Sequence, residues 1–97
     1  MILVRDVFQA KYGKGGDLVA LMKEARTTWL AEYASGRILT DASGQFFTVV
    51  TEIEVESLAD WEKRGQEVFA LPEFGGWFSR MTELVESGRR EFYNIET

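Results

Sequence analysis

Residues 45–55 constrain the fold more than any other stretch of the chain, because they alternate as a β-strand does and carry apolar groups on both faces. The odd-numbered face is largely apolar, whereas the even-numbered face is apolar at its start and acidic at its end: Phe47, Val49, Thr51, Ile53 and Val55 against Phe46, Thr48, Val50, Glu52 and Glu54. Such a strand has to lie between two layers of structure. The helices of a short chain cover only one face, so we expect a second copy of the chain to cover the other.

Composition narrows the class of protein. The chain has 97 residues, of which 45% are apolar and 28% charged, and this is typical of one folded domain over residues 1–97. The net charge of −5 argues against nucleic acid or an anionic membrane surface as a partner. No apolar run approaches the roughly 20 residues of a membrane-spanning helix, and no secretory signal pattern follows Met1. We therefore expect a cytoplasmic protein.

The residue types that are missing exclude several chemistries. Cysteine and histidine are both absent, which removes thiolate catalysis, zinc-thiolate sites and the commonest general base and metal ligand. Glu52 and Glu54 stand two apart on one strand face and could share a cation. Two carboxylates are too few ligands for calcium, so we interpret them as a solvated strand end. We expect neither a metal nor a cofactor.

Hydrophobic periodicity predicts four strands and three helices. The strands are expected at residues 2–11, 37–41, 45–55 and 89–96, and the helices at 17–33, 57–71 and 72–87. This order predicts an α+β fold of the split βαβ or ferredoxin-like type, with a four-stranded antiparallel sheet and all helices on one face.

Local signals mark where the helices begin and end. Ser57 followed by Asp60 is close to a capping box at the start of the second helix, and Pro72 separates the second helix from the third. Gly36, after residues 34–35, and Gly88 are the expected ends of the first and third helices.

The glycine-rich residues 12–17 precede the first helix. Lys14 and the glycines could form a phosphate-binding loop, but their spacing fits neither common phosphate-binding motif. We interpret the segment as a turn in which Asp17 caps the helix.

The outer face of the sheet predicts how the protein assembles. If the even-numbered residues of each strand point away from the helices, they form an apolar patch that is too large to stay exposed on a monomer. We therefore predict a homodimer, with the following residues in its interface: Val4, Phe8, Phe46, Thr48, Val50 and Phe92.

Three segments resemble NIPSNAP-like proteins. In residues 51–64 a strand leads into a helix that starts with Ser-Leu-Ala-Asp and continues with charged residues. The strand, turn and helix of residues 5–22 and the step into an aromatic helix at residues 71–74 are similar too. The resemblance covers nearly the whole chain, and it implies a dimeric α/β-barrel fold.

The superfamily that the resemblance implies contains several activities. It includes cofactor-free antibiotic-biosynthesis monooxygenases, haem-degrading monooxygenases, muconolactone-type isomerases and ligand-sensing domains. Haem-binding members rely on a histidine, which this chain lacks, so the resemblance does not imply haem degradation here. One fold hosts many functions, and the activity has to be argued from the site.

Three functions remain open at this point. The abundance of aromatic residues, three Trp, seven Phe and three Tyr, indicates a site for a small apolar or aromatic molecule between sheet and helices. The same side chains could simply fill the core. The protein could instead be a cofactor-free monooxygenase or an isomerase, or a structural assembly module without a cavity.

No motif identifies catalytic residues. The candidate ligand-binding residues are Arg5, Trp29, Tyr33, Thr51, Trp61, Trp77 and Tyr93. Arg5, Thr51 and Tyr93 have the strand parity expected to face the helices; the alternatives are an Arg5 that extends to solvent and a Tyr93 in the core. Trp29 and Tyr33 lie four residues apart on the first helix, where core packing is the alternative to a pocket.

Overall fold

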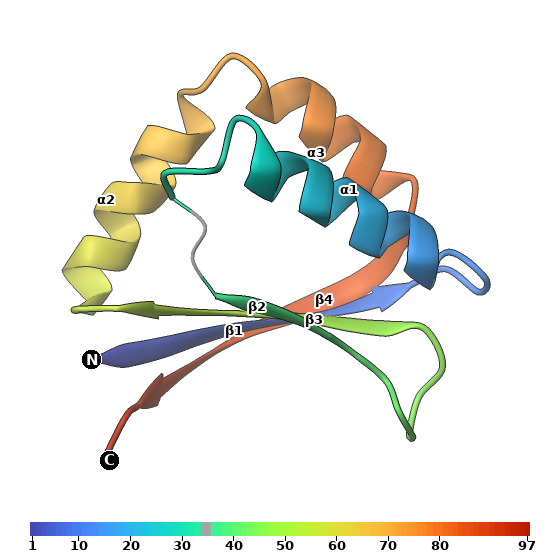
Figure 1. Ribbon diagram of the computed structural model, residues 1–97, viewed down its shortest axis with the longest axis horizontal. Coiled ribbons are helices and arrows are strands. Elements are labelled where there is room, and N and C mark those ends of the chain that lie inside the picture. Colours follow the sequence, from blue (N-terminus) through green and yellow to red (C-terminus); the bar gives the residue numbers. More distant parts are fainter. Residues whose placement is uncertain (34–35) are drawn as a thin grey trace.

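The computed structural model describes residues 1–33 and 36–97, which form one four-stranded antiparallel sheet and three helices. The elements in chain order are β1 (Ile2–Ala10), α1 (Gly15–Thr27), β2 (Arg37–Thr40), β3 (Thr48–Val55), α2 (Leu58–Phe69), α3 (Phe74–Thr82) and β4 (Val85–Asn94). The strands lie in the order β2-β3-β1-β4, and all three helices lie on one side of the sheet (Figure 1). The ferredoxin-like α+β fold predicted from the sequence is confirmed.

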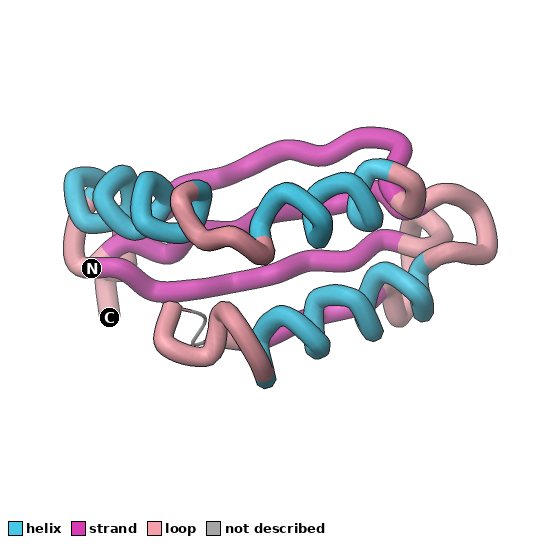
Figure 2. Tube along the Cα trace, turned by 90° about the horizontal axis from the view of Figure 1, so that it is seen from above, coloured by secondary structure: helices cyan, strands magenta, loops and turns pink. Residues whose placement is uncertain are grey.

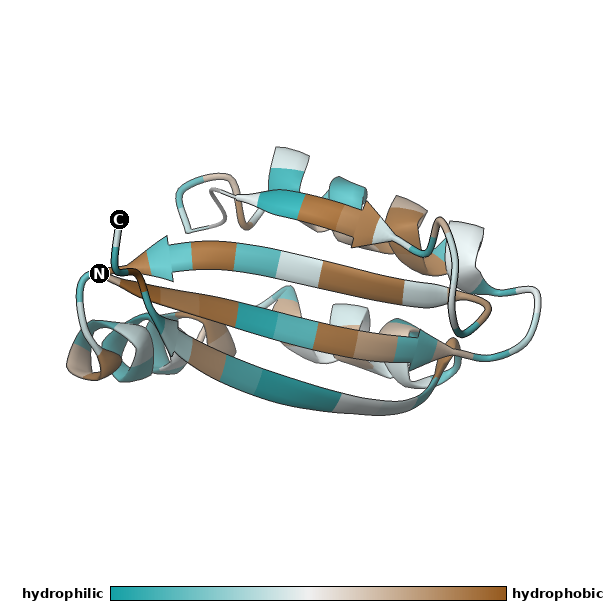
Figure 3. Ribbon diagram, turned by 90° about the horizontal axis from the view of Figure 1, so that it is seen from below, coloured by the Kyte–Doolittle hydropathy of each residue, from teal (hydrophilic) through white to brown (hydrophobic). Residues whose placement is uncertain are grey.

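The pairing register decides which residues share a face. Val4 of β1 pairs with Ile53 of β3 and with Phe92 of β4, so even-numbered residues of β1 and β4 lie on the same side as odd-numbered residues of β3. We call the side toward the helices the covered face and the other side the open face. Figure 2 shows the helices laid over the covered face, and Figure 3 shows the open face.

The core lies between α1 and the covered face. Leu18 and Met22 of α1 pack with Val49 of β3 and Ala10 of β1, all at most 5% exposed. Trp77 of α3 packs against this cluster, and its indole N–H donates to the carbonyl of Leu21 at 3.2 Å. Because the helices bury one side of the sheet only, nothing in residues 1–33 and 36–97 covers the open face.

The first helix is shorter than predicted. It begins at Gly15 without a side-chain cap, so Asp17 is not its N-cap, and it ends at Thr27 rather than Tyr33. The hydroxyls of Thr27 and Thr28 donate to main-chain carbonyls one turn back, in competition with the helix ladder. The chain then turns, and residues 34–35, which precede the predicted stop at Gly36, lie outside the described residues.

The inner strand β3 begins at Thr48, three residues later than predicted. Phe47 has φ 59°, a left-handed conformation that breaks the strand before it starts. Its ring lies 4.9 Å from that of Tyr12 and packs against Gly15 at the start of α1. The alternation of residues 45–47 was therefore not a strand signal.

The end of α3 was predicted too late. The helix ends at Thr82, and Gly88 lies inside β4 opposite Phe8. The β-strand begins at the β-branched Val85, and a Cβ on Gly88 would lie 3.3 Å from the carbonyl oxygen of Val7. The glycine thus permits a close strand pair and does not stop a helix.

The start of α2 is confirmed. The backbone N–H of Asp60 donates to the hydroxyl of Ser57 at 3.1 Å, and Ser57 is extended, as an N-cap residue should be. The Asp60 carboxylate in turn accepts from the backbone N–H of Glu56 at 3.4 Å.

Three of the predicted interface residues lie on the covered face. Val4 is 2% exposed, Phe8 packs against the core, and the ring of Phe92 lies 6.1 Å from that of Trp61 in α2. The prediction that they lie on the outer face is wrong, because it assumed one parity for all strands. Thr48 and Val50 do lie on the open face, and Phe46 lies in the loop before β3, 66% exposed.

Within residues 1–33 and 36–97, no helix has the length and apolar character needed to cross a bilayer.

Candidate functional site

An aromatic cavity of about 220 Å³ lies between the sheet and the helices. Its walls come from β1, β3 and β4, from α2 and α3, and from the turn after α1. The lining residues are Asp6, Trp29, Leu30, Tyr33, Ile53, Trp61, Arg64, Gly65, Val68, Phe69, Phe74, Trp77 and Arg90. We call this hollow the aromatic cavity.

A smaller hollow of about 160 Å³ adjoins it toward α1. Both are lined by Asp6, Leu30, Ile53 and Trp77. Thr51 and Phe8 line the smaller hollow from the sheet, and Met22 lines it from α1. The two hollows therefore lie side by side on the covered face.

The turn after α1 places Trp29 in the cavity wall. The backbone N–H of Leu30 donates to Ala25 across the end of the helix at 2.8 Å, which closes the turn tightly. The Trp29 ring then lies edge-on to Trp77 and Phe74 of α3, with centroid separations of 5.8 and 6.4 Å. Edge-to-face aromatic packing of this kind holds the rings in defined orientations.

An ion pair supplies the polar part of the wall. Nε and Nη2 of Arg90 donate to the two carboxylate oxygens of Asp6 at 2.6 and 3.1 Å. The guanidinium of Arg90 also lies 4.6 Å from the ring centre of Trp61. The pair therefore joins β1 and β4 under α2, in a bidentate geometry that fixes both side chains.

A second arginine lines the cavity from α2. Nε of Arg64 lies 3.2 Å from a carboxylate oxygen of Asp60, one helical turn earlier. Gly65 follows it and leaves the helix surface free of a side chain at this point of the wall. At this part of the wall, α2 therefore contributes the charged side chain of Arg64 and, at Gly65, no side chain.

The structure brings together only some of the predicted ligand-binding residues. Trp29, Tyr33, Trp61 and Trp77 line the aromatic cavity, and Thr51 lines the adjoining hollow. Arg5 and Tyr93 lie on the open face, opposite the cavity. Their expected position among the helix-facing residues is wrong, for the same reason of strand parity.

Sequence reasoning missed the three charged residues of the wall. Asp6 and Arg90 lie on different strands and share no local motif, and Arg64 belongs to the charged residues of segment 51–64. Their spacing did hold a signal, because Arg64 follows Trp61 by three positions and thus shares its helix face. The pairing of Asp6 with Arg90 became visible only with the β1–β4 register.

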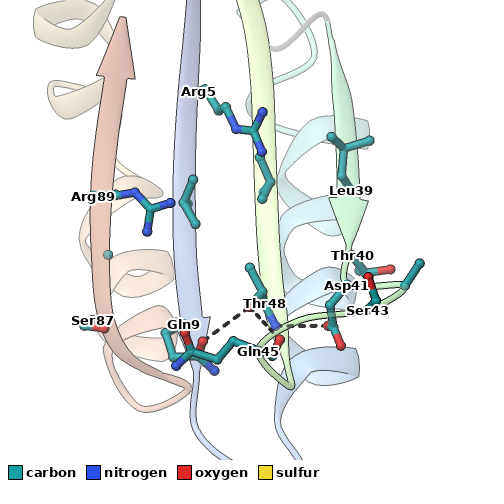
Figure 4. A pocket seen from close by; sticks show the side chains of 14 residues that line it. Arg5, Gln9, Leu39, Thr40, Asp41, Ser43, Gln45, Thr48, Ser87 and Arg89 are labelled. Carbon is teal, nitrogen blue, oxygen red and sulfur yellow. Dashed lines mark hydrogen bonds between the residues drawn. The ribbon is translucent and has the colours of Figure 1, made fainter.

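A larger hollow, of about 610 Å³, lies on the open face (Figure 4). Arg5 and Arg89 lie over its sheet floor, while Gln9, Thr48 and Asp41 gather at its other end. There Thr48 donates its hydroxyl to Gln9 at 3.3 Å and its backbone N–H to Asp41 at 3.0 Å. Its polar walls and exposed position on a twisted sheet distinguish it from the aromatic cavity.

A row of alternating charges crosses the open face next to this hollow. Glu52, 5% exposed, lies between Arg37 at 2.7 Å and Arg5 at 3.5 Å, and Arg5 in turn lies 3.6 Å from Glu91. The row follows the register across all four strands, from Arg37 on β2 to Glu91 on β4. We call these four residues the ion row.

The acidic pair considered for a cation does not form a solvated edge. Glu52 is buried between arginines, whereas Glu54 is exposed. In the part of the chain that the structure describes, no group of three or more acidic side chains is placed to hold a metal ion.

The sheet, the helices on one side and the cavity between them define an α+β protein with the fold of dimeric α/β-barrel structures. An uncharacterised NIPSNAP domain protein from Burkholderia xenovorans superposes with a TM-score of 0.89 at 17% identity, over 98% of this chain and 94% of that one. A NIPSNAP family protein from Agrobacterium tumefaciens matches with a TM-score of 0.86 at 17% identity, over 96% and 90%.

A protein described as an antibiotic biosynthesis monooxygenase matches with a TM-score of 0.72 at 13% identity, over 100% of both chains. No protein-family model matches the sequence, and neither does any curated protein. The predicted resemblance to NIPSNAP proteins is thus confirmed at the level of the fold.

Proposed function

We propose that the protein binds a small, largely apolar or aromatic molecule in the aromatic cavity. One observation carries this proposal: all three tryptophans of the chain line the same hollow of about 220 Å³. An apolar cavity of about 150 Å³ is enough to hold benzene, so the space fits a molecule of one or two rings.

The cavity argues against two alternatives: aromatic residues that only fill the core, and a structural assembly module without a cavity. A core filled by its aromatics, or an assembly module without a ligand, would have a sealed interface between helices and sheet. Here the wall includes Phe69, which is 66% exposed. An exposed aromatic side chain at the edge of a cavity is suited to cover a ligand, whereas it adds little buried surface to a core.

Tryptophan fluorescence and thermal unfolding test ligand binding. Titration with naphthalene-sized aromatic compounds should quench the emission, because all three tryptophans lie at the site. The melting temperature should rise with ligand concentration, by several degrees at about 100 times Kd, since only the folded state binds. If saturating compounds change neither signal, the protein does not bind such molecules.

We also propose that a second copy of the chain covers the open face. The apolar side chains Leu39, Val50 and Val7 pair in register across β2, β3 and β1 and form a stripe at the middle of this face. The stripe lies directly beside the ion row. An apolar stripe next to charged residues is suited to an interface between proteins.

The ion row favours a copy of the same chain as the partner. Its charges alternate as Arg37, Glu52, Arg5 and Glu91. A two-fold axis that reverses the row sets each arginine opposite a glutamate of the other copy, so the row is complementary to itself. Within the described residues the buried Nε of Arg5 has no hydrogen-bond partner, and it lies 3.6 Å from a carboxylate oxygen of Glu91 in the same row.

An enzyme of the same site is the second candidate function. Asp6 places a carboxylate in the aromatic cavity, where it could act as the base of an isomerase, and one matching fold is described as an antibiotic biosynthesis monooxygenase. For any compound found to bind, proton exchange with D₂O followed by NMR tests the isomerase, and oxygen uptake tests the monooxygenase. Asp6→Asn should abolish the exchange. A bound compound that shows neither reaction leaves binding as the function.

A further inference from the structure

The charges in the wall of the aromatic cavity differ from those of the whole molecule. The chain carries a net charge of −5, yet the cavity is lined by two arginines, Arg64 and Arg90, and by a single carboxylate, that of Asp6. The two hydrogen bonds between Asp6 and Arg90 pair those charges with each other. Arg64 is the remaining charged group of the lining.

Arg64 keeps most of its donors unused. Its contact with Asp60 joins Nε to a carboxylate oxygen at 3.2 Å. Among the described residues, no hydrogen bond engages either of its Nη atoms. The same holds for Nη1 of Arg90, whose bonds to Asp6 use Nε and Nη2.

These free nitrogens have a chemical preference. The planar guanidinium group donates in parallel and matches the two oxygens of a carboxylate. The side chain of Arg90 is held by Asp6 and by the face of Trp61 at 4.6 Å, so its free nitrogen has a defined position. The terminal nitrogens of Arg64 make no hydrogen bond within the described residues, so they can donate to an anion.

The aromatic walls select the rest of the molecule. The rings of Trp29, Trp77 and Phe74 lie 5.8 to 6.4 Å apart. The volume of about 220 Å³ exceeds the roughly 150 Å³ that holds one benzene ring. One or two fused rings therefore fit in the cavity against these side chains.

We propose that the ligand is an aromatic monocarboxylate of one or two rings, whose ring system packs among Trp29, Trp77 and Phe74 and whose carboxylate binds Arg64 and the free nitrogen of Arg90. This inference rests on the proposed function and specifies its ligand class. The apolar part supplies burial, and the arginines distinguish the anion from neutral molecules of the same shape.

Two compounds of nearly equal shape test the inference. 2-Naphthoate and 2-naphthamide differ in charge and little else, and isothermal titration calorimetry measures both with the unmodified protein. We expect 2-naphthoate to bind at least about tenfold more tightly, as hydrogen bonds to charged groups would give. If the amide binds as tightly as the acid, the inference is overturned and the proposed function stands; if neither compound binds, both are overturned.

Two matched variants locate the effect. Arg64→Gln should reduce the preference for 2-naphthoate to less than about threefold and leave the affinity for 2-naphthamide unchanged. Arg80→Gln is the control, because Arg80 pairs with Glu24 at 2.7 Å on the outer side of α1 and α3, away from the aromatic cavity. It should keep the full preference. If Arg64→Gln weakens both compounds by the same factor, Arg64 shapes the cavity without recognising the anion, and the inference fails.

Discussion

Glu52 lies buried between Arg37 and Arg5 on the open face, although its alternation with Glu54 indicated a solvated strand end. Nothing local distinguishes the two glutamates, since both point to the same side of β3. The difference comes from the neighbouring strands. Arg37 and Arg5 are the cross-strand partners of Glu52, and opposite charges at such positions attract.

At Gly36, too, the neighbouring strand determines which residue type fits. It has φ +144°, and a Cβ there would overlap the backbone oxygen of Glu52 in β3. Its own carbonyl accepts a hydrogen bond from Arg26 of α1. The glycine therefore lets the chain enter β2 close to β3.

Replacing this glycine should destabilise the protein. Gly36→Ala introduces both a strained φ, worth about 1–3 kcal/mol, and an overlap with β3, so we expect the free energy of unfolding to fall by at least about 2 kcal/mol. Urea denaturation followed by circular dichroism measures the change.

Gly16→Ala is the matched control for that change. Gly16 lies in α1 with open space around its Cβ position, and alanine is the better helix former by about 1 kcal/mol. The control should be neutral or stabilising. A similar loss in both variants would contradict the role assigned to Gly36.

At the scale of the elements, the helices were easier to predict at their starts than at their ends. Ser57 and Asp60 form the expected cap of α2, because the capping signal is local and is contained in four residues. The end of α1 depends on Thr27 and Thr28, whose hydroxyls turn back to the helix carbonyls. Trp29 and Tyr33 keep the helical spacing of apolar residues beyond this point. The sequence therefore predicted a longer helix and did not indicate the turn that places Trp29 in the cavity wall.

The cap of α2 predicts a measurable effect. Ser57→Ala removes the acceptor of the Asp60 N–H and should lower the stability by about 1 kcal/mol, which corresponds to a fall of about 4–8 °C in melting temperature for a domain of this size. Thermal unfolding followed by circular dichroism measures it.

Ser79→Ala in α3 is the control for the cap. The Ser79 hydroxyl donates to the carbonyl of Gly75 at an exposed position of the helix, an arrangement that does not stabilise a helix. Its stability should change by less than about 0.5 kcal/mol. Equal effects of the two substitutions would show that the Ser57 hydroxyl does not act as a cap.

At the scale of the whole molecule, the open face predicts the state of assembly. The chain has a mass of 11.1 kDa, and light scattering at micromolar concentration should give twice this mass. Leu39→Lys places a charge beside Val50 on the open face and should shift the protein to the monomer, since the charge would be buried against the partner. A monomeric mass for the unmodified protein would contradict the proposed dimer.

Leu58→Lys is the control, because it makes the same change from leucine to lysine away from the open face. Leu58 is 56% exposed at the start of α2, on the helix side of the sheet and away from the open face. This variant should keep the mass of the unmodified protein. Dissociation of both variants would indicate a general loss of folding, which circular dichroism would detect.

Hydrophobic periodicity alone determined the order of the seven elements, the fold class and the two-sided character of residues 48–55. These features follow from spacing along one chain, because a strand alternates every two residues and a helix repeats every 3.6. The tryptophans of the candidate site were also found this way, since large aromatic residues in a small domain indicate either core or cavity.

Only the tertiary structure decided which residues of different strands lie on the same side of the sheet. Alternation shows which residues of one strand share a side, but the pairing register sets how neighbouring strands align, and a shift of one residue exchanges the faces. Val4 lies beside Ile53 and Phe92, so Phe8 and Phe92 face the helices while Arg5 and Tyr93 lie on the open face. The same register brought Asp6 to Arg90 in the cavity wall, a contact between residues 84 positions apart.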